Sequence, residues 1–206
     1  MRPIRILAVS DSVQRRLEAG DLRERLGPID LLVGCGDLPP SYLEYLLTHL
    51  NIPAACVPGN HDPDEYAVPG AWVVDGRWAR AAGLTLTGFG GSRRYKSDGR
   101  HQYTEAEMTA RVAMALPRLL LRRLRKGHGV DIVITHAPPF GVHDASDLPH
   151  VGFRSLGWLV RTARPRVLLH GHTHRDPNLD PAESTLHGAR VINVNPYRLV
   201  EIERGE

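Results

Sequence analysis

Short apolar segments alternate with helical patterns along most of this chain, and the alternation limits what it can fold into. The segments are mostly β-branched or aliphatic and are bounded by Gly, Pro, Asp or Asn, as buried strands are. Such alternation is typical of an α/β protein in which helices cover a central sheet. The expected strands are residues 4–9, 29–34, 54–57, 84–89, 130–135, 166–170 and 191–194.

Apolar residues recur at helical spacing in three other segments, which we expect to form helices. The last of them begins with a capping box formed by Thr104 and Glu107. Pro117 lies inside this segment and is expected to kink the helix or divide it in two, because proline removes a backbone donor and clashes with the preceding turn. The expected helices are residues 13–26, 41–50 and 104–124.

Two further patterns concern the connections. Residues 189–203 alternate apolar and polar side chains, which predicts a closing hairpin. Residues 90–103 are polar and form one long loop, and a loop of this length in a compact domain is usually functional or mobile.

Length and composition exclude several classes of protein. A chain of 206 residues without an evident linker predicts a single domain over residues 1–206. No apolar segment is long enough to cross a bilayer or to form a signal-peptide core, so we expect a cytoplasmic protein. The two cysteines have no paired spacing, and the net charge of +3 is only mildly basic. The basic residues near 118–126 have no aromatic residues among them, which argues against nucleic acid as a partner.

Side chains that bind metal ions follow five of the expected strands. Because the carboxyl ends of parallel strands form one edge of a sheet, these side chains can meet in one cleft. Gly36, Gly59 and Gly171 beside them allow sharp turns and close approach of the backbone. Imidazole, carboxylate and amide ligands without thiolate suit Mn, Fe, Zn or Ni. The residues are Asp11, Asp37, Asn60, His61, Asp62, His136, His172 and His174.

In this order the residues resemble the calcineurin-like metallophosphoesterase family. The family pattern is D-x-H, G-D, G-N-H-[DE], [TS]-H and G-H-x-H. Four of these five blocks are intact here, and they extend over nearly the whole chain. The resemblance implies a two-sheet αββα sandwich within the α/β class.

The resemblance also implies a role for each residue. Asp37 would bridge two divalent metal ions, and the remaining protein ligands would divide between the two sites. His61 would not bind metal; it would contact the phosphate or protonate the leaving oxygen while a metal-activated hydroxide attacks phosphorus. The implied ligands of one site are Asn60, His136 and His172, and those of the other are Asp11 and His174.

One position departs from the family pattern. The histidine of the D-x-H block is replaced by Val13, whose side chain binds no metal, so one of the two sites is expected to be weakened. Water, Ser12 or Gln14 could fill the place, and so could His143 or His150 from the loop after His136. The sequence leaves these alternatives open.

The expected function is a metal-dependent phosphoesterase that acts on a small phosphodiester such as a cyclic nucleotide. Candidate substrate contacts are Asn60, His143, His150 and Arg94. The alternative, suggested by Val13, is a binding or scaffold protein that kept the fold and lost the catalysis. We expect no membrane partner, and the sequence leaves a homo-oligomer open.

Overall fold

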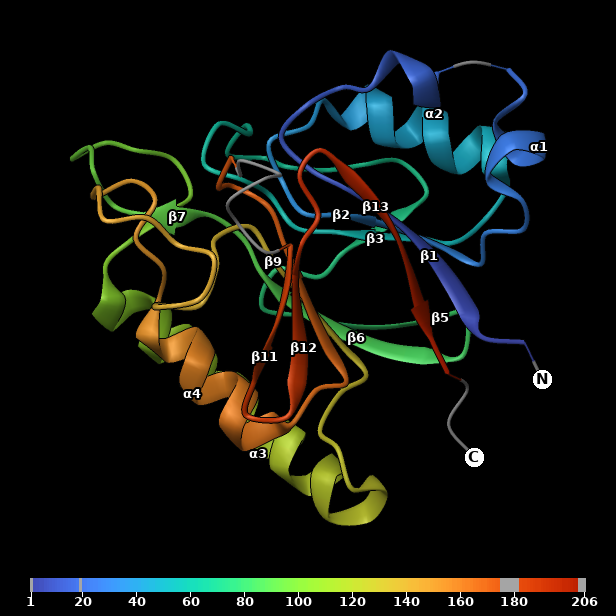
Figure 1. Cartoon of the computed structure of the whole chain (residues 1–206). Coiled ribbons are helices and arrows are strands. Elements are labelled where there is room, and N and C mark those ends of the chain that lie inside the picture. Colours follow the sequence, from blue (N-terminus) through green and yellow to red (C-terminus); the bar gives the residue numbers. More distant parts are fainter. Residues whose placement is uncertain (1, 19, 175–181, 204–206) are drawn as a thin grey trace.

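Two β-sheets lie face to face, and helices cover the outer face of each sheet (Figure 1). The computed structural model describes residues 2–18, 20–174 and 182–203. This arrangement confirms the expected αββα sandwich. The first sheet has the strand order β13(Tyr197–Ile202), β1(Ile4–Val9), β2(Leu31–Gly34), β3(Ala54–Cys56), β4(Ala71–Val73). The second has the order β11(Glu183–Leu186), β12(Ala189–Asn193), β10(Val167–His170), β9(Ile132–Thr135), β6(Leu84–Phe89), β5(Trp78–Ala81).

The main hydrophobic core lies between the two sheets. Alternate residues of each strand face it, such as Ile4 and Ile6 of β1 and Ile132 and Ile134 of β9. The intervening residues face the helices, and Leu7 packs with the helices on the first sheet. Since both faces of these strands are buried, their sequences are continuous apolar runs, and this is why they could be recognised.

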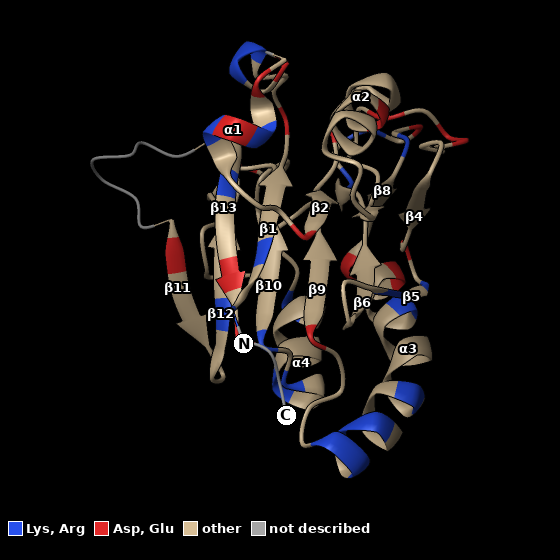
Figure 2. Ribbon diagram, turned by 90° about the vertical axis from the view of Figure 1, so that its right-hand side faces the viewer, with Lys and Arg blue, Asp and Glu red and all other residues tan. Residues whose placement is uncertain are grey.

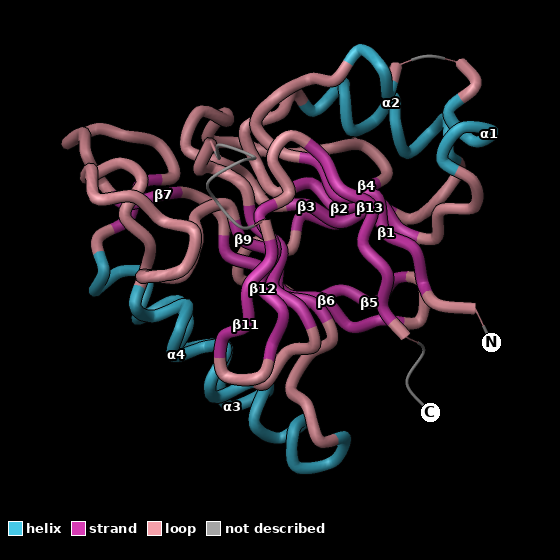
Figure 3. Tube along the Cα trace, in the orientation of Figure 1, coloured by secondary structure: helices cyan, strands magenta, loops and turns pink. Residues whose placement is uncertain are grey.

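Within the described residues, four α-helices form the outer layers. On the first sheet lie α1(Leu22–Leu26) and α2(Pro40–Leu50), and on the second lie α3(Glu105–Lys126) and α4(Arg154–Ala163). Figures 2 and 3 show α3 and α4 running together along the second sheet. None of the described helices is long and apolar enough to span a membrane.

One expected helix is wrong, and of the two effects expected of Pro117, a kink or a division, the division is excluded. Residues 13–26 form a short 3₁₀-helix, Arg15–Leu17, and then α1, because Gly20 and the exposed Val13 do not support one continuous amphipathic helix. Pro117 does not divide α3, which is continuous. Pro117 lies on the exposed side of the helix, where solvent can bind the carbonyl that lacks a donor.

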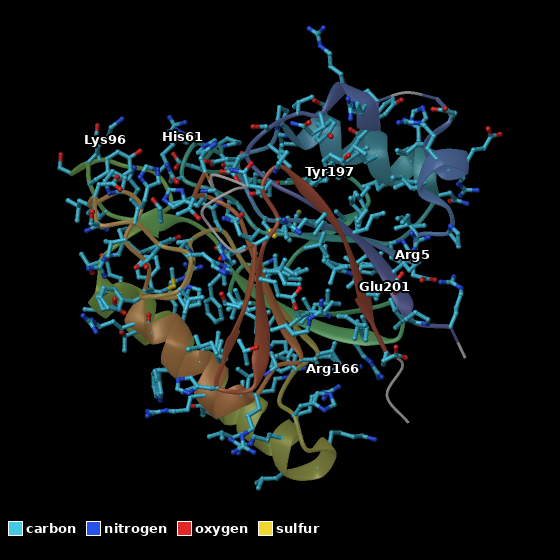
Figure 4. All side chains as sticks on the ribbon, viewed as in Figure 1. Arg5, His61, Lys96, Arg166, Tyr197 and Glu201 are labelled. Carbon is cyan, nitrogen blue, oxygen red and sulfur yellow. The ribbon has the colours of Figure 1, made fainter. Side chains whose placement is uncertain are left out.

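The expected hairpin over residues 189–203 is also wrong. The two strands of this segment belong to different sheets: β12 pairs with β10 and β11, whereas β13 pairs antiparallel with β1. In that register Arg5 lies opposite Glu201, and the two side chains form an ion pair of 3.3 Å (Figure 4). Because the chain crosses from the second sheet to the first after β12, β13 buries Val200 and Ile202 in the core between the sheets.

The loop of residues 90–103 is more ordered than its polarity suggests. Its ends form two short parallel strands, β7(Ser92–Arg93) and β8(Gln102–Tyr103). The side-chain oxygen of Gln102 accepts hydrogen bonds from the backbone of Tyr95 and Lys96. The loop is therefore fixed at both ends beside α3.

Candidate metal centre

The candidate ligands lie on loops that follow strands of both sheets. Those from β1, β2 and β3 belong to the first sheet, and those from β9 and β10 belong to the second. The sequence predicted convergence at the edge of one sheet. The structure instead brings the carboxyl ends of two sheets together at one end of the sandwich.

Three of the predicted ligands form a compact group: Asp37, His136 and His172. One ligand atom of each lies within 4.8 Å of the others. Among the described residues this is the one group of three or more acidic, histidine or cysteine side chains with that geometry. Both histidines are buried. We call these three residues the metal group.

The ring of His136 is oriented by the backbone. Its Nδ1 atom donates a hydrogen bond of 2.7 Å to the carbonyl of Cys35, which leaves Nε2 facing the site. There Nε2 lies 3.1 Å from Oδ1 of Asn60 and 3.3 Å from Oδ2 of Asp37. If His136 were neutral, the lone pair on Nε2 would face these two acceptor oxygens. A proton or a metal cation is therefore needed between Nε2 and the oxygens.

The electrostatics of the pair agree with that requirement. Burial alone raises the pKa of Asp37, but the charge and hydrogen bond of His136 outweigh it and lower the pKa to about 2. Burial alone lowers the pKa of His136, and the charge of Asp37 raises it to about 9. The residues present therefore fit a divalent cation bound between carboxylate, amide oxygen and imidazole.

His172 is held in the protonation state that a metal ligand needs. Its Nε2 atom donates to the carbonyl of Pro149 at 2.8 Å, so the lone pair of the neutral ring lies on Nδ1. Burial, with the nearby charge of His136, lowers the pKa of His172 to about 3. The ring is thus neutral at physiological pH and available to a metal ion.

Asp62 and Gly59 position the Asp37 carboxylate. The Asp62 carboxylate accepts hydrogen bonds from the backbone N–H of Asp37 at 2.9 Å and of Gly59 at 2.7 Å. A Cβ atom on Gly59 would lie 2.0 Å from Oδ1 of Asp37, so only glycine permits this approach. The backbone N–H of His61 completes the set by donating to Oδ1 of Asp37 at 2.8 Å.

Three residues at the same place have a strained backbone. Asp11, Asp37 and His172 have φ angles of 62°, 55° and 67°, in the left-handed region that residues with a side chain rarely adopt. Each such conformation costs of the order of 1 kcal/mol or more and persists when surrounding contacts enforce it. Strain of this kind is typical of functional sites.

The residues expected at the second metal site are less closely assembled. The Asp11 carboxylate accepts from the backbone N–H of His172 at 2.9 Å, which places it beside the metal group. His174 is exposed, and so is Val13, a residue that is 42% exposed. Neither belongs to the metal group.

His61 occupies the open side of the centre. Its side chain is 70% exposed, and its Nε2 atom lies 4.0 Å from Oδ2 of Asp37. Figure 4 shows the ring at the end of the molecule where the loops gather. It is accessible to a substrate and tethered by its backbone to the carboxylate of the metal group.

The candidate substrate residues have separate environments. The ring of His150 lies 4.9 Å from that of His172, at the edge of the metal group. His143 instead contacts buried His170 and Ser184, each at 2.9 Å. Arg94 donates to the carbonyl of Gln102 and to the carboxylate of Glu107 at the start of α3.

Sequence reasoning named one contributor without its role and missed another. Asp62 belongs to the G-N-H-D block, but its two backbone contacts could not be inferred from the block. Tyr95 accepts a hydrogen bond of 3.3 Å from the amide nitrogen of Asn60, which points the amide oxygen toward His136. No sequence pattern distinguished Tyr95 from other residues of its loop.

Comparison with known proteins agrees with the geometry. A family model described as calcineurin-like phosphoesterase matches residues 4–176. One solved structure is similar over 97% of this chain and 95% of its own, with 16% identity and a TM-score of 0.66. The crystal structure of TT1561 of Thermus thermophilus is similar over 93% and 89%, with 17% identity and a TM-score of 0.64. These likenesses establish the fold. The search of curated proteins gave no match.

Proposed function

Because this chain belongs to the calcineurin-like phosphoesterase family, we propose that it hydrolyses small phosphodiesters at the metal group of Asp37, His136 and His172. Family membership supports a metal-dependent phosphoester hydrolase in general. The observation that carries the proposal is the arrangement of His136, whose Nε2 atom faces two acceptor oxygens and so calls for a cation. Exposed His61 stands beside it as a group able to donate a proton.

The proposed ligands of the first ion are the metal group and the amide oxygen of Asn60. For a second ion we propose Asp11 and His174, with Asp37 shared, and manganese as the native metal. Divalent ions bound here would neutralise the phosphoryl oxygens and lower the pKa of water enough to supply hydroxide near neutral pH.

In this proposal His61 protonates the leaving oxygen. Its exposed ring can reach a substrate, and its backbone bond to Asp37 keeps it at a constant place relative to the metal group. A general acid at such a position contributes about 10²–10⁴-fold to the rate.

We propose Asn60 and His150 as substrate contacts because both border the metal group. His143 and Arg94 are also candidates, but each already has polar partners that a substrate would displace. In the described parts of the chain, loops alone border the centre. Because no further domain there offers a surface for a folded protein, we favour a small substrate.

Turnover and metal content test the proposal. Hydrolysis of bis(p-nitrophenyl) phosphate with Mn²⁺ should exceed that of p-nitrophenyl phosphate and should stop with a chelator. Elemental analysis should find bound metal, which Asp37→Asn should lose. Asp98→Asn, an exposed carboxylate in the nearby loop, is the matched control and should retain both metal and activity.

A second set of variants tests the proton donor. His61→Asn should lower kcat by about 10²–10⁴-fold and leave the metal bound. His187→Asn, at an exposed turn, should change neither. Normal turnover of His61→Asn would contradict the proposed role.

The alternative function is a metal-binding scaffold without catalysis, which the exposed Val13 and His174 favour. Folded protein under saturating Mn²⁺ that hydrolyses neither ester would support it. Val13→His should then raise the metal content toward two ions per chain, whereas Val13→Ala should not. An unchanged content in both would mean that another group already fills the position.

A further inference from the structure

A cleft of about 500 Å³ lies between β5 and α3, at the other end of the second sheet from the metal group. Thr85, near the start of β6, borders the cleft. At the other end of β6, Phe89 pairs with Thr135 of β9, and His136 of the metal group follows Thr135. From Thr85 to Phe89 a strand extends about 13 Å at roughly 3.3 Å per residue. We call this the basic cleft and define it by Trp78, Arg80, Arg118, Arg122, Arg125 and Lys126.

Two elements far apart in the sequence build the basic cleft. Trp78 and Arg80 are two residues apart in β5 and therefore share one face of the strand. On α3, Arg118, Arg122 and Arg125 follow at intervals of four and three residues and form one stripe. Figure 2 shows Lys and Arg (blue) gathered toward the C-terminal end of α3.

The charges of the basic cleft are mostly unpaired. Arg122 is neutralised by Asp131, whose carboxylate lies 3.1 Å from its Nη2 atom. In the described parts of the chain, no hydrogen bond or ion pair engages the charged groups of Arg80, Arg125 or Lys126, and no carboxylate lines the cleft. Cations placed together in this way repel one another, and a bound anion would relieve the repulsion.

Trp78 gives Arg118 a defined orientation. The guanidinium carbon of Arg118 lies 4.9 Å from the centre of the indole ring, in cation–π geometry. The indole also packs against the apolar cluster under α3, which fixes its plane. A planar guanidinium held in place suits phosphate oxygens, because less freedom is lost on binding.

Simpler explanations cover only part of the cluster. Arg125 and Lys126 stand in the last turn of α3, where cations offset the helix dipole. That explanation does not apply to Arg80, which comes from β5. A nucleic-acid backbone would need a long basic groove, whereas these cations converge on one cleft with the volume of a small-molecule site.

We propose that the basic cleft binds the polyphosphate group of a small molecule, either as inorganic polyphosphate or as part of a nucleotide. The site is separate from the metal group and does not depend on the proposed hydrolysis. Its recognition rests on charge and guanidinium geometry.

Calorimetric titration of the whole chain in EDTA tests this site without contribution from bound metal. Sodium tripolyphosphate and ATP should both bind, more weakly as salt rises, and adenosine should not. Tighter binding of ATP would identify a nucleotide as the source of the phosphate group, and equal binding would identify inorganic polyphosphate.

Charge reversals locate the binding. Arg125→Glu and Arg80→Glu, both exposed side chains, should each weaken tripolyphosphate binding by about ten-fold or more. Arg161→Glu, exposed on α4, makes the same charge change and should have less than about a two-fold effect. Absence of binding, equal weakening by all three variants, or displacement of tripolyphosphate by a much tighter single-stranded oligonucleotide would overturn the proposal.

Discussion

The imidazole of His136 donates a hydrogen bond to the backbone carbonyl of Cys35 and so joins the two sheets beside the metal group. His136 follows β9 in the second sheet, and Cys35 follows β2 in the first. The bond fixes which ring nitrogen faces Asp37 and Asn60. The packing of the sandwich and the orientation of a candidate metal ligand therefore depend on the same contact.

Asp62→Ala should destabilise the protein and reduce its metal content. The substitution leaves the part-buried N–H of Asp37 and the buried N–H of Gly59 without an acceptor, at a cost of up to about 1–3 kcal/mol each. Urea unfolding and elemental analysis measure the two effects. The exposed carboxylate variant Asp98→Ala is the control, and equal behaviour of both variants would contradict the positioning role of Asp62.

Gly59→Ala should abolish metal binding, because its Cβ atom would overlap the Asp37 carboxylate. The matched control is Gly157→Ala inside α4, where no atom lies within 4 Å of the added Cβ. That control should stabilise the protein by roughly 0.5–1 kcal/mol through helix propensity. Metal retained by Gly59→Ala would mean that the carboxylate can move without loss of the site.

Glu105→Ala should lower the free energy of unfolding by about 1–3 kcal/mol. The Glu105 carboxylate, in the first turn of α3, accepts hydrogen bonds from the backbone N–H groups of Arg154 and Ser155 at the start of α4. It also pairs with Arg93 at 2.8 Å. Chemical denaturation measures the loss, and Glu105→Gln, which keeps an acceptor oxygen, should recover part of it. If Glu105→Gln lowered the free energy of unfolding as much as Glu105→Ala, the contribution of Glu105 would come from its charge alone.

The two cysteines should be unreactive in the folded protein. Burial raises the pKa of Cys56 from 9.0 to about 12 and raises the pKa of Cys35 well above its usual range. At pH 8 a thiol reagent such as Ellman's reagent should therefore label the chain only after unfolding.

The same shift predicts how stability depends on pH. Between about pH 9 and 12 the Cys56 thiol ionises in the unfolded chain but stays neutral in the fold, so the unfolded state binds fewer protons. The free energy of unfolding should fall as pH rises through this window. Cys56→Ala should show a smaller fall than the unmodified protein, and identical pH profiles would contradict the shift.

Local sequence determined the strands and most of the ligand positions. Runs such as residues 4–9 and 130–135 could be recognised because both faces of each strand are buried, which requires apolar side chains throughout. The residues at the ends of these runs, Asp37 and His136 among them, could be named because the carboxyl ends of strands converge.

Only the tertiary structure decided how distant segments meet. Sequence periodicity cannot distinguish a hairpin partner from a strand that crosses to the other sheet, so the position of β13 beside β1 could not be predicted. The side-chain contacts of Arg94 with Glu107, of His143 with His170 and of Trp78 with Arg118 could not be predicted either. Side-chain partners far apart in sequence are set by packing in three dimensions, whereas the tendency to form a buried strand is carried by neighbouring residues.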